Sequence, residues 1–284
     1  MKEKHVAVVG AGTMGSGIGQ VFAQSGYDVD LIDVDKKVLE TSKGRIEKSV
    51  NKLASKGAID PTQVDDILGR IHPVPAIEKM SPVFLVVEAV PENFDLKKKI
   101  FTALDKTAPE GAVLATNTSS ISITEIAAVT RRPEKVIGMH FMNPVPLMKL
   151  VELIRGIATS DEVFEKIDGL ARELGKTPVE VQDYPGFISN RILMPMINEA
   201  IYALMEGVAT AEAIDTVMKL GMNHPMGPLT LADFIGLDVC LDIMEVLYNG
   251  FSDPKYRPCP LLKKMVSAGY LGRKSGRGFF VYEG

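Results

Sequence analysis

The stretch HVAVVGAGTMG, residues 5–15, decides how this chain folds. His5–Val9 is a short apolar run typical of a buried strand, and the pattern G-x-G-x-x-G follows it directly at Gly10, Gly12 and Gly15. An apolar pattern with helical spacing then begins at Ile18. The order strand, glycine turn and helix predicts the opening βα unit of a parallel sheet.

Each residue of the glycine turn suits the binding of a dinucleotide. Gly10 permits the tight turn, Gly12 lets a pyrophosphate approach the backbone, and Gly15 lets helix and strand pack closely. Thr13 and Met14 open the helix, whose first N–H groups can bind an anion. A glycine-rich turn without a ligand is the alternative, and the strand before and helix after the motif disfavour it.

An acidic residue closes the second strand-like run. Asp33 follows Val29–Ile32 and lies 23 residues after Gly10 (33 − 10), close to the ~20 typical of dinucleotide-binding units. Its carboxylate can accept hydrogen bonds from the adenosine ribose and would repel a 2′-phosphate. We therefore expect NAD as cofactor rather than NADP, although Lys36 and Lys37 weaken that repulsion.

Strand and helix patterns alternate up to about residue 182. This alternation predicts an α/β fold with a Rossmann-type, doubly wound, mostly parallel sheet. Helices are expected over residues 35–56 and around 96–104. Further strands are expected at Val83–Val90, Ala112–Ala115, Val136–Phe141, Leu150–Ile154 and Val179–Val181.

The pattern changes at Asp183–Gly186, and everything that follows is helical in character. We therefore expect a dinucleotide-binding domain over residues 1–184 and an all-helical substrate and dimerisation domain over residues 185–284. Its expected helices are Phe187–Glu206, Ala211–Leu220, Leu229–Tyr248 and Leu261–Ala268. The first carries apolar residues on more than one face, which predicts a homodimer or a dimer of dimers. These residues are Leu193, Met194, Met196, Ile197 and Ile201.

The composition excludes several function classes. The 284 residues carry a net charge of −4 with a pI of about 5.7, which argues against a nucleic-acid partner. We see no apolar run near the ~20 residues that span a bilayer, and no room for a signal peptide before the first strand. Cys240 and Cys259 form no metal-binding spacing, so we expect a reduced, cytoplasmic protein.

The stretch GMHFMNPVPLMKLVE, residues 138–152, carries the candidate chemistry. His140 lies in an apolar strand-like run, and Glu152 lies twelve residues on (152 − 140) in a second one. A carboxylate beside an imidazole fixes the ring tautomer and stabilises the imidazolium. With the cofactor motif, this pair favours a dehydrogenase over a hydrolase.

Taken together, these motifs resemble the L-3-hydroxyacyl-CoA dehydrogenase family along essentially the whole chain. In its size and in the absence of a fused hydratase, the chain resembles the stand-alone bacterial 3-hydroxybutyryl-CoA dehydrogenases of butyrate and butanol fermentation. The matching segments are VVGAGTMGSGIGQVFAQSGYDV (8–29), VVEAVPENFDLKKKIF (86–101), TNTSS (116–120), GMHFMNPVPLMKLVE (138–152), DYPGFISNRI (183–192), MGP (226–228) and GRKSGRGFF (272–280).

The resemblance implies four catalytic positions. The family's catalytic histidine falls on His140, its carboxylate partner on Glu152, its serine that contacts substrate and cofactor on Ser119, and its asparagine from the second domain on Asn190. All four have structural alternatives. His140 could be merely structural, an alternative that Glu152 and the cofactor motif disfavour. Ser119 could cap the following helix, Asn190 could bond its own backbone, and Glu152 could pair with a surface lysine.

The same resemblance implies further cofactor contacts. Glu92 and Lys97 match positions near the nicotinamide ribose, and Asn143 is expected to line the cleft. Lys274 lies in the closing glycine-rich motif, where it could reach the cofactor. Lys97 also begins a run of three lysines, so a solvated surface is the alternative for Glu92 and Lys97. An ordinary glycine-rich turn is the alternative for Lys274.

A row of lysines suggests the substrate. Lys48, Lys52 and Lys56 share one helix face, and Lys52 and Lys56 match the family's CoA-binding lysines. A solvated helix face is the alternative. We expect an acyl-CoA substrate: an NAD-dependent enzyme that interconverts acetoacetyl-CoA and (S)-3-hydroxybutyryl-CoA. A dehydrogenase of a free hydroxy acid or polyol, and a non-catalytic NAD-binding protein, are the competing hypotheses.

Overall fold

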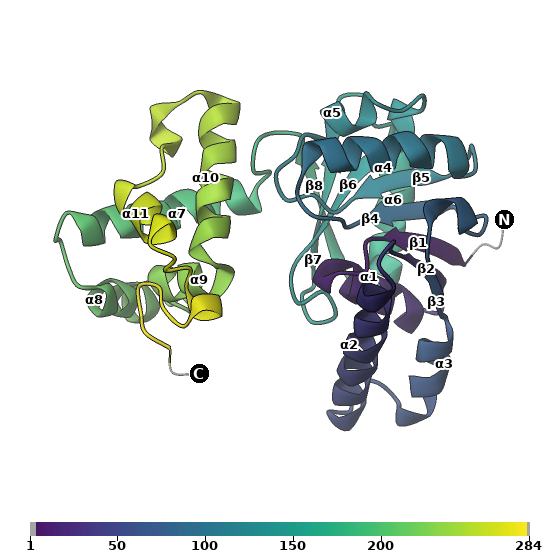
Figure 1. Cartoon of the computed structure of the whole chain (residues 1–284), viewed down its shortest axis with the longest axis horizontal. Helices are drawn as coiled ribbons and strands as arrows, with labels where there is room; N and C mark the ends of the chain where they lie inside the picture. Colours follow the sequence, from purple (N-terminus) through teal and green to yellow (C-terminus); the bar gives the residue numbers. More distant parts are fainter. Residues whose placement is uncertain (1–3, 283–284) are drawn as a thin grey trace. The chain divides into compact units, whose positions relative to one another are not determined.

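The computed structural model describes residues 4–282 and divides the chain into two compact units between Asp183 and Tyr184. The first unit contains a sheet with helices around it, and the second contains helices, drawn in green to yellow (Figure 1). The division falls in the Asp183–Gly186 segment, where the sequence pattern changes from alternating to helical.

One eight-stranded sheet organises the first unit, in the order β3-β2-β1-β4-β5-β6-β7-β8. Strands β1 to β6 are parallel, β7 is antiparallel to β6, and β8 is parallel to β7. The expected Rossmann-type, mostly parallel sheet is confirmed. The strands are β1 His5–Val9, β2 Asp28–Ile32, β3 Ile71–Val74, β4 Leu85–Glu88, β5 Val113–Thr116, β6 Val136–Phe141, β7 Leu150–Arg155 and β8 Thr177–Gln182.

Helices cover both faces of this sheet (Figure 1). One face shares an apolar core with α1, α2, α3 and α6. On the other face, Ile123 of α5 packs against Gly138 of β6, and α4 lies beside α5. The helices are α1 Thr13–Gln24, α2 Lys36–Ser55, α3 Val64–Gly69, α4 Phe94–Thr107, α5 Ile123–Ala127 and α6 Asp161–Glu173.

Two features of the first unit differ from the sequence patterns. The expected strand Val83–Val90 is only Leu85–Glu88, because the Val90 N–H turns back to the Glu88 carboxylate at 2.7 Å instead of joining the sheet. Strand β3 was not predicted from the sequence, because its residues show no apolar alternation and include Pro73. Proline is tolerated there because β3 is the edge strand of the sheet.

The second unit is built of helices, as expected, and its described residues add only isolated β-bridges at Arg277, which pairs with Gly272 and Val281. Its helices are α7 Ser189–Met205, α8 Ala211–Thr216, α9 Pro228–Ile235, α10 Leu237–Phe251 and α11 Pro260–Ser267. The expected single helix Leu229–Tyr248 is wrong. Gly236 interrupts it with φ of 106°, and the Leu237 N–H bonds to the Leu271 carbonyl at 3.3 Å.

The dimer surface expected on α7 also needs correction. Met194, Ile197 and Ile201 are buried in the core of their own unit, against residues of α9, α10 and α11. Leu193 and Met196 are only half-buried. In the part of the chain that the structure describes, no helix is both long and apolar enough to cross a membrane.

Candidate active site

The glycine turn has the geometry that a dinucleotide requires. Gly10 has φ of 98°, and a Cβ there would lie 2.7 Å from the Ala89 carbonyl oxygen. A Cβ on Gly15 would lie 1.7 Å from the Gly10 oxygen, so helix α1 can approach β1 only with glycine at this position. By contrast, a Cβ built on Gly12 would meet no described atom within 4 Å apart from those of its own stretch of chain. Gly12 therefore borders open space at the start of α1.

The start of α1 can hold an anion in that space. Gly12 is the N-cap, no side chain caps the helix, and the first turn from Thr13 contains no acidic residue. The first N–H groups of a helix point outward and carry partial positive charge, which suits a pyrophosphate. The residues present thus fit the phosphates of NAD.

Asp33 holds the glycine turn from the end of β2. Its Oδ2 accepts a hydrogen bond from the Ala11 N–H at 2.9 Å, and its Oδ1 accepts one from the Asp35 N–H at 3.0 Å. Each carboxylate oxygen can accept a further hydrogen bond. The half-buried carboxylate can therefore receive the ribose hydroxyls while it fixes the turn.

Strand pairing brings His140 and Glu152 together. The two residues are direct partners in the antiparallel pairing of β6 with β7, so their side chains project from the same face of the sheet. His140 Nδ1 lies 2.7 Å from Glu152 Oε2. Both side chains are buried, at 8 % and 3 % exposure. The Glu152 carboxylate thus pairs with the imidazole of His140.

Ser119 completes a linear array with this pair. It lies in the loop after β5, and its Oγ is 3.1 Å from His140 Nε2. The N-cap of α5 is Ser122, whose hydroxyl accepts from the Glu125 N–H, so Ser119 is not the cap of that helix. Carboxylate, imidazole and hydroxyl therefore follow one another at hydrogen-bond distance.

Glu92 holds residues 117–122, the loop between β5 and α5 that we call the Ser119 loop. Its Oε1 accepts from the Ser119 N–H and the Ser120 N–H, both at 3.0 Å, and from the Thr118 hydroxyl at 2.5 Å. Burial raises the pKa of Glu92, but the Lys97 ammonium and these hydrogen bonds outweigh burial and lower it below its ordinary value. Glu92 is therefore ionised at neutral pH.

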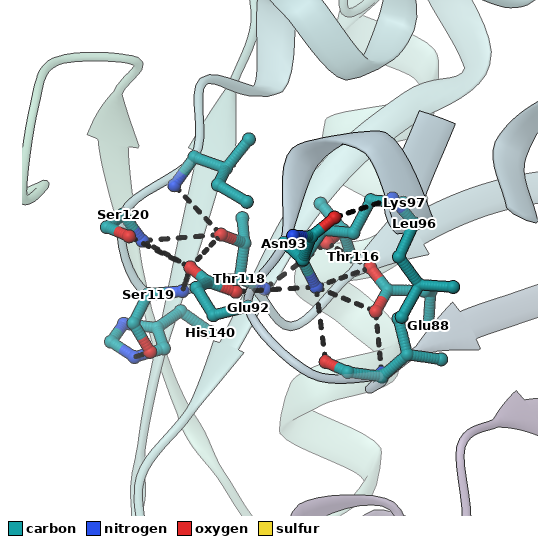
Figure 2. A network of polar contacts seen from close by, with 12 residues as sticks. Glu88, Glu92, Asn93, Leu96, Lys97, Thr116, Thr118, Ser119, Ser120 and His140 are labelled. Carbon is teal, nitrogen blue, oxygen red and sulfur yellow. Dashed lines mark hydrogen bonds and ion pairs between the residues drawn. The ribbon is translucent and has the colours of Figure 1, made fainter. Parts of the chain in front are cut away.

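Lys97 is buried rather than solvated. Its ammonium lies 2.7 Å and 2.9 Å from the two carboxylate oxygens of Glu88 and 3.4 Å from Glu92 Oε2 (Figure 2). Glu88 and its partner Thr116 were missed in the sequence. The available signal was Glu88 itself, the single acidic residue in the apolar run VFLVVEAV. A carboxylate is seldom buried in such a run unless it is paired.

The remaining candidates lie in several places. Asn143, in the loop after β6, lines a cavity of about 150 Å³ together with Thr13 and Ser16 of α1. In the second unit, Asn190 is the mostly buried second residue of α7. Lys274 of that unit forms an ion pair with Asp238 at 2.5 Å.

The candidate CoA lysines lie at the C-terminal end of α2. Lys52 is in its last turn and Lys56 is its C-cap, and both side chains are exposed. The sheet face that carries His140 and the exposed side of α2 therefore belong to the same unit. No described group of His, Cys, Asp and Glu side chains could hold a metal ion in residues 4–282.

Comparisons with known proteins place the chain in a family. Residues 5–184 match the 3-hydroxyacyl-CoA dehydrogenase NAD binding domain, and residues 186–282 match the 3-hydroxyacyl-CoA dehydrogenase C-terminal domain. A Bacillus subtilis protein named "Probable 3-hydroxybutyryl-CoA dehydrogenase" is 57 % identical over 100 % of this chain and 99 % of its own length.

Two further comparisons agree with these matches. The 3-hydroxybutyryl-CoA dehydrogenase of Bradyrhizobium diazoefficiens is 52 % identical over 99 % of this chain and 96 % of its own. The crystal structure of (S)-3-hydroxybutyryl-CoA dehydrogenase from Ralstonia eutropha covers 100 % of both chains, with a TM-score of 0.97 and 49 % identity. The chain is therefore an NAD-dependent oxidoreductase that belongs to the 3-hydroxyacyl-CoA dehydrogenase family.

Proposed function

We propose that this protein interconverts acetoacetyl-CoA and (S)-3-hydroxybutyryl-CoA, with His140 as the acid/base. The observation that carries the proposal is the array in which His140 Nδ1 meets Glu152 and His140 Nε2 meets Ser119, at 2.7 Å and 3.1 Å. The names of the relatives support the substrate. When bound, NADH supplies a hydride to C3 of the substrate, and NAD accepts it in the reverse direction.

His140 moves the proton that accompanies the hydride. In reduction, the imidazolium donates its Nε2 proton to the alkoxide that forms at C3; in oxidation, the neutral ring takes the proton of the 3-hydroxyl at the same atom. Glu152 accepts from the Nδ1–H, which leaves Nε2 facing the substrate in both directions and stabilises the cation.

Two polar side chains orient the substrate in this proposal. Ser119 presents its hydroxyl beside Nε2, where the oxygen on C3 must lie for proton transfer. Asn190, a catalytic position by resemblance to the family, is expected to donate a hydrogen bond to the substrate oxygen. Lys52 and Lys56 attract the phosphates of coenzyme A.

NADH oxidation on addition of acetoacetyl-CoA tests the proposal. The wild-type protein should turn over rapidly, and His140→Ala should lower kcat by ~10²–10⁴-fold, the usual contribution of a general acid/base. His72→Ala is the matched control, because His72 is an exposed histidine on the edge strand β3. A wild-type protein that binds NADH but leaves it unoxidised in the presence of acetoacetyl-CoA refutes the assignment.

We further propose a cytoplasmic homodimer, or a dimer of dimers, joined through the second unit. That unit exposes large apolar side chains, which include Ile192, Leu220 and Phe234 at 66 %, 81 % and 56 % exposure. Such residues favour self-association when they gather at one surface. Light scattering at micromolar concentration should give at least twice the mass of the 30.8 kDa chain, and a monomer there refutes this assembly.

A further inference from the structure

The carboxylate of Glu88 lies at the centre of a buried polar network. Glu88 ends β4 and has no exposed surface. Its Oε1 accepts from the Val90 N–H at 2.7 Å, and its Oε2 accepts from the Thr116 hydroxyl at 2.7 Å. The Lys97 ammonium contacts both oxygens. The carboxylate is thus held by one cation and two neutral donors.

Lys97 lies between two carboxylates at unequal distances. Its ammonium is 2.7 Å from the nearer oxygen of Glu88 and 3.4 Å from Glu92 Oε2. The Lys97 side chain is 1 % exposed, whereas the Glu92 side chain is 38 % exposed. A buried ammonium needs an anionic partner, and here Glu88 is the closer one.

Glu92 uses its other oxygen to hold the Ser119 loop. Figure 2 shows Glu92 between that loop and the Glu88–Lys97 pair. Its Oε1 accepts from the Ser119 N–H at 3.0 Å, and the Ser119 Oγ lies 3.1 Å from His140 Nε2. The position of the Glu92 carboxylate therefore bears on the position of Ser119 relative to the imidazole.

We propose that Glu88 is a positioning residue for the Ser119–His140 contact, through its neutralisation of Lys97. With Glu88 ionised, Lys97 is satisfied and Glu92 stays on the Ser119 loop. Without that charge, Glu92 is the only other carboxylate within 4 Å of the Lys97 ammonium among the described residues, and it is drawn toward Lys97 and away from the loop. The Ser119 N–H then loses Glu92 as its acceptor, and the Ser119 Oγ moves away from its position beside His140 Nε2.

This inference rests on the proposed function and makes a specific kinetic prediction. Glu88→Gln keeps the shape of the side chain but removes its charge. Because a displacement near 1 Å can cost ~10²-fold in rate, we expect kcat to fall on the order of 10-fold. If Glu88 acts through Ser119, the same change should do little in a Ser119→Ala background, where kcat of the double variant stays within about twofold of Ser119→Ala.

The matched control is Asp105→Asn. Asp105 is another carboxylate of the same unit, 5 % exposed, and its Oδ1 pairs with Arg132 at 3.1 Å. It lies on α4, and its carboxylate accepts hydrogen bonds from Arg131 and Arg132, which lie outside the network of Glu88, Lys97 and Glu92. Its loss should lower the thermal midpoint and leave kcat within about twofold, as expected for a site outside the network.

The outcomes are distinct. If Glu88→Gln lowers kcat by the same factor in the wild-type and in the Ser119→Ala background, the positioning role is overturned. A merely structural effect would lower kcat equally in both backgrounds. If Glu88→Gln does not fold, Thr116→Val is the second variant, because it removes one hydrogen-bond donor to Glu88. It should lower kcat by a smaller factor, and this loss should disappear in the Ser119→Ala background. An equal factor in both backgrounds overturns the role. An inactive wild-type protein overturns the proposed function and this inference with it.

Discussion

His140 and Glu152 occupy one rung of the β6–β7 pairing, with Nδ1 and Oε2 2.7 Å apart. The contact depends on two neighbouring strands of a buried sheet and on no loop. Main-chain hydrogen bonds on both sides of the rung thus set the separation of the two side chains before any substrate binds.

Glu152→Gln should keep this geometry and lose the charge. A neutral amide does not stabilise an imidazolium, so we expect kcat for acetoacetyl-CoA reduction to fall by ~10²-fold or more, with little change in the KM for NADH. Glu180→Gln on β8 is the control, since Glu180 is an exposed carboxylate that pairs with Arg155. Wild-type turnover by Glu152→Gln contradicts the role of the pair.

Substitutions at two positions of the glycine turn should have different effects, one on NADH binding and the other on stability. Gly12→Ala should fold normally, because its Cβ meets nothing and its φ is −66°, yet it should weaken NADH binding by ~10-fold or more, since it fills the space for the pyrophosphate. Gly15→Ala should instead unfold at much lower temperature, because its Cβ would overlap the Gly10 oxygen. Thermal midpoints and NADH fluorescence titrations distinguish the two; unchanged NADH affinity in Gly12→Ala would count against the cofactor site.

Charge reversal on α2 tests the acyl-CoA substrate. Lys52→Glu together with Lys56→Glu should raise the KM for acetoacetyl-CoA about tenfold or more at low ionic strength and leave NADH binding unchanged, because the reversed charges repel the CoA phosphates. Lys98→Glu with Lys99→Glu, on the exposed side of α4, makes the same charge change elsewhere. An unchanged KM in the α2 variant favours a dehydrogenase of a free hydroxy acid or polyol.

The two cysteines should be inert in the folded protein. Burial raises the pKa of the Cys240 thiol to about 12, and it also raises that of Cys259. A raised pKa keeps the thiol protonated at pH ~8, where an ordinary cysteine near 8.5 is partly the reactive thiolate. Mass spectrometry after iodoacetamide treatment should find neither residue modified in native protein and both modified in denaturant. Rapid native alkylation contradicts this.

The sequence predicts the fold and much of the first unit's site because those features have local signals. The apolar run of β6 and the glycine turn are visible without a structure, and the resemblance then assigns His140 and Ser119. The network around Glu88 has no such signal, since its partners Lys97 and Thr116 meet it only when α4 and β5 pack beside β4. The break at Gly236 was missed because apolar spacing continues across it.

The direct opposition of residues 140 and 152 also makes turnover a sensitive reporter of how the two strands align. Side chains on a strand alternate between faces, so a slip of β7 by one position would put Val151 or Leu153 across from the imidazole and send the carboxylate to the apolar side. A molecule with this shifted register would stay compact and keep its helices, yet it would have no catalytic activity. Deletion of one residue within 150–152 should therefore abolish activity, because it shifts this register.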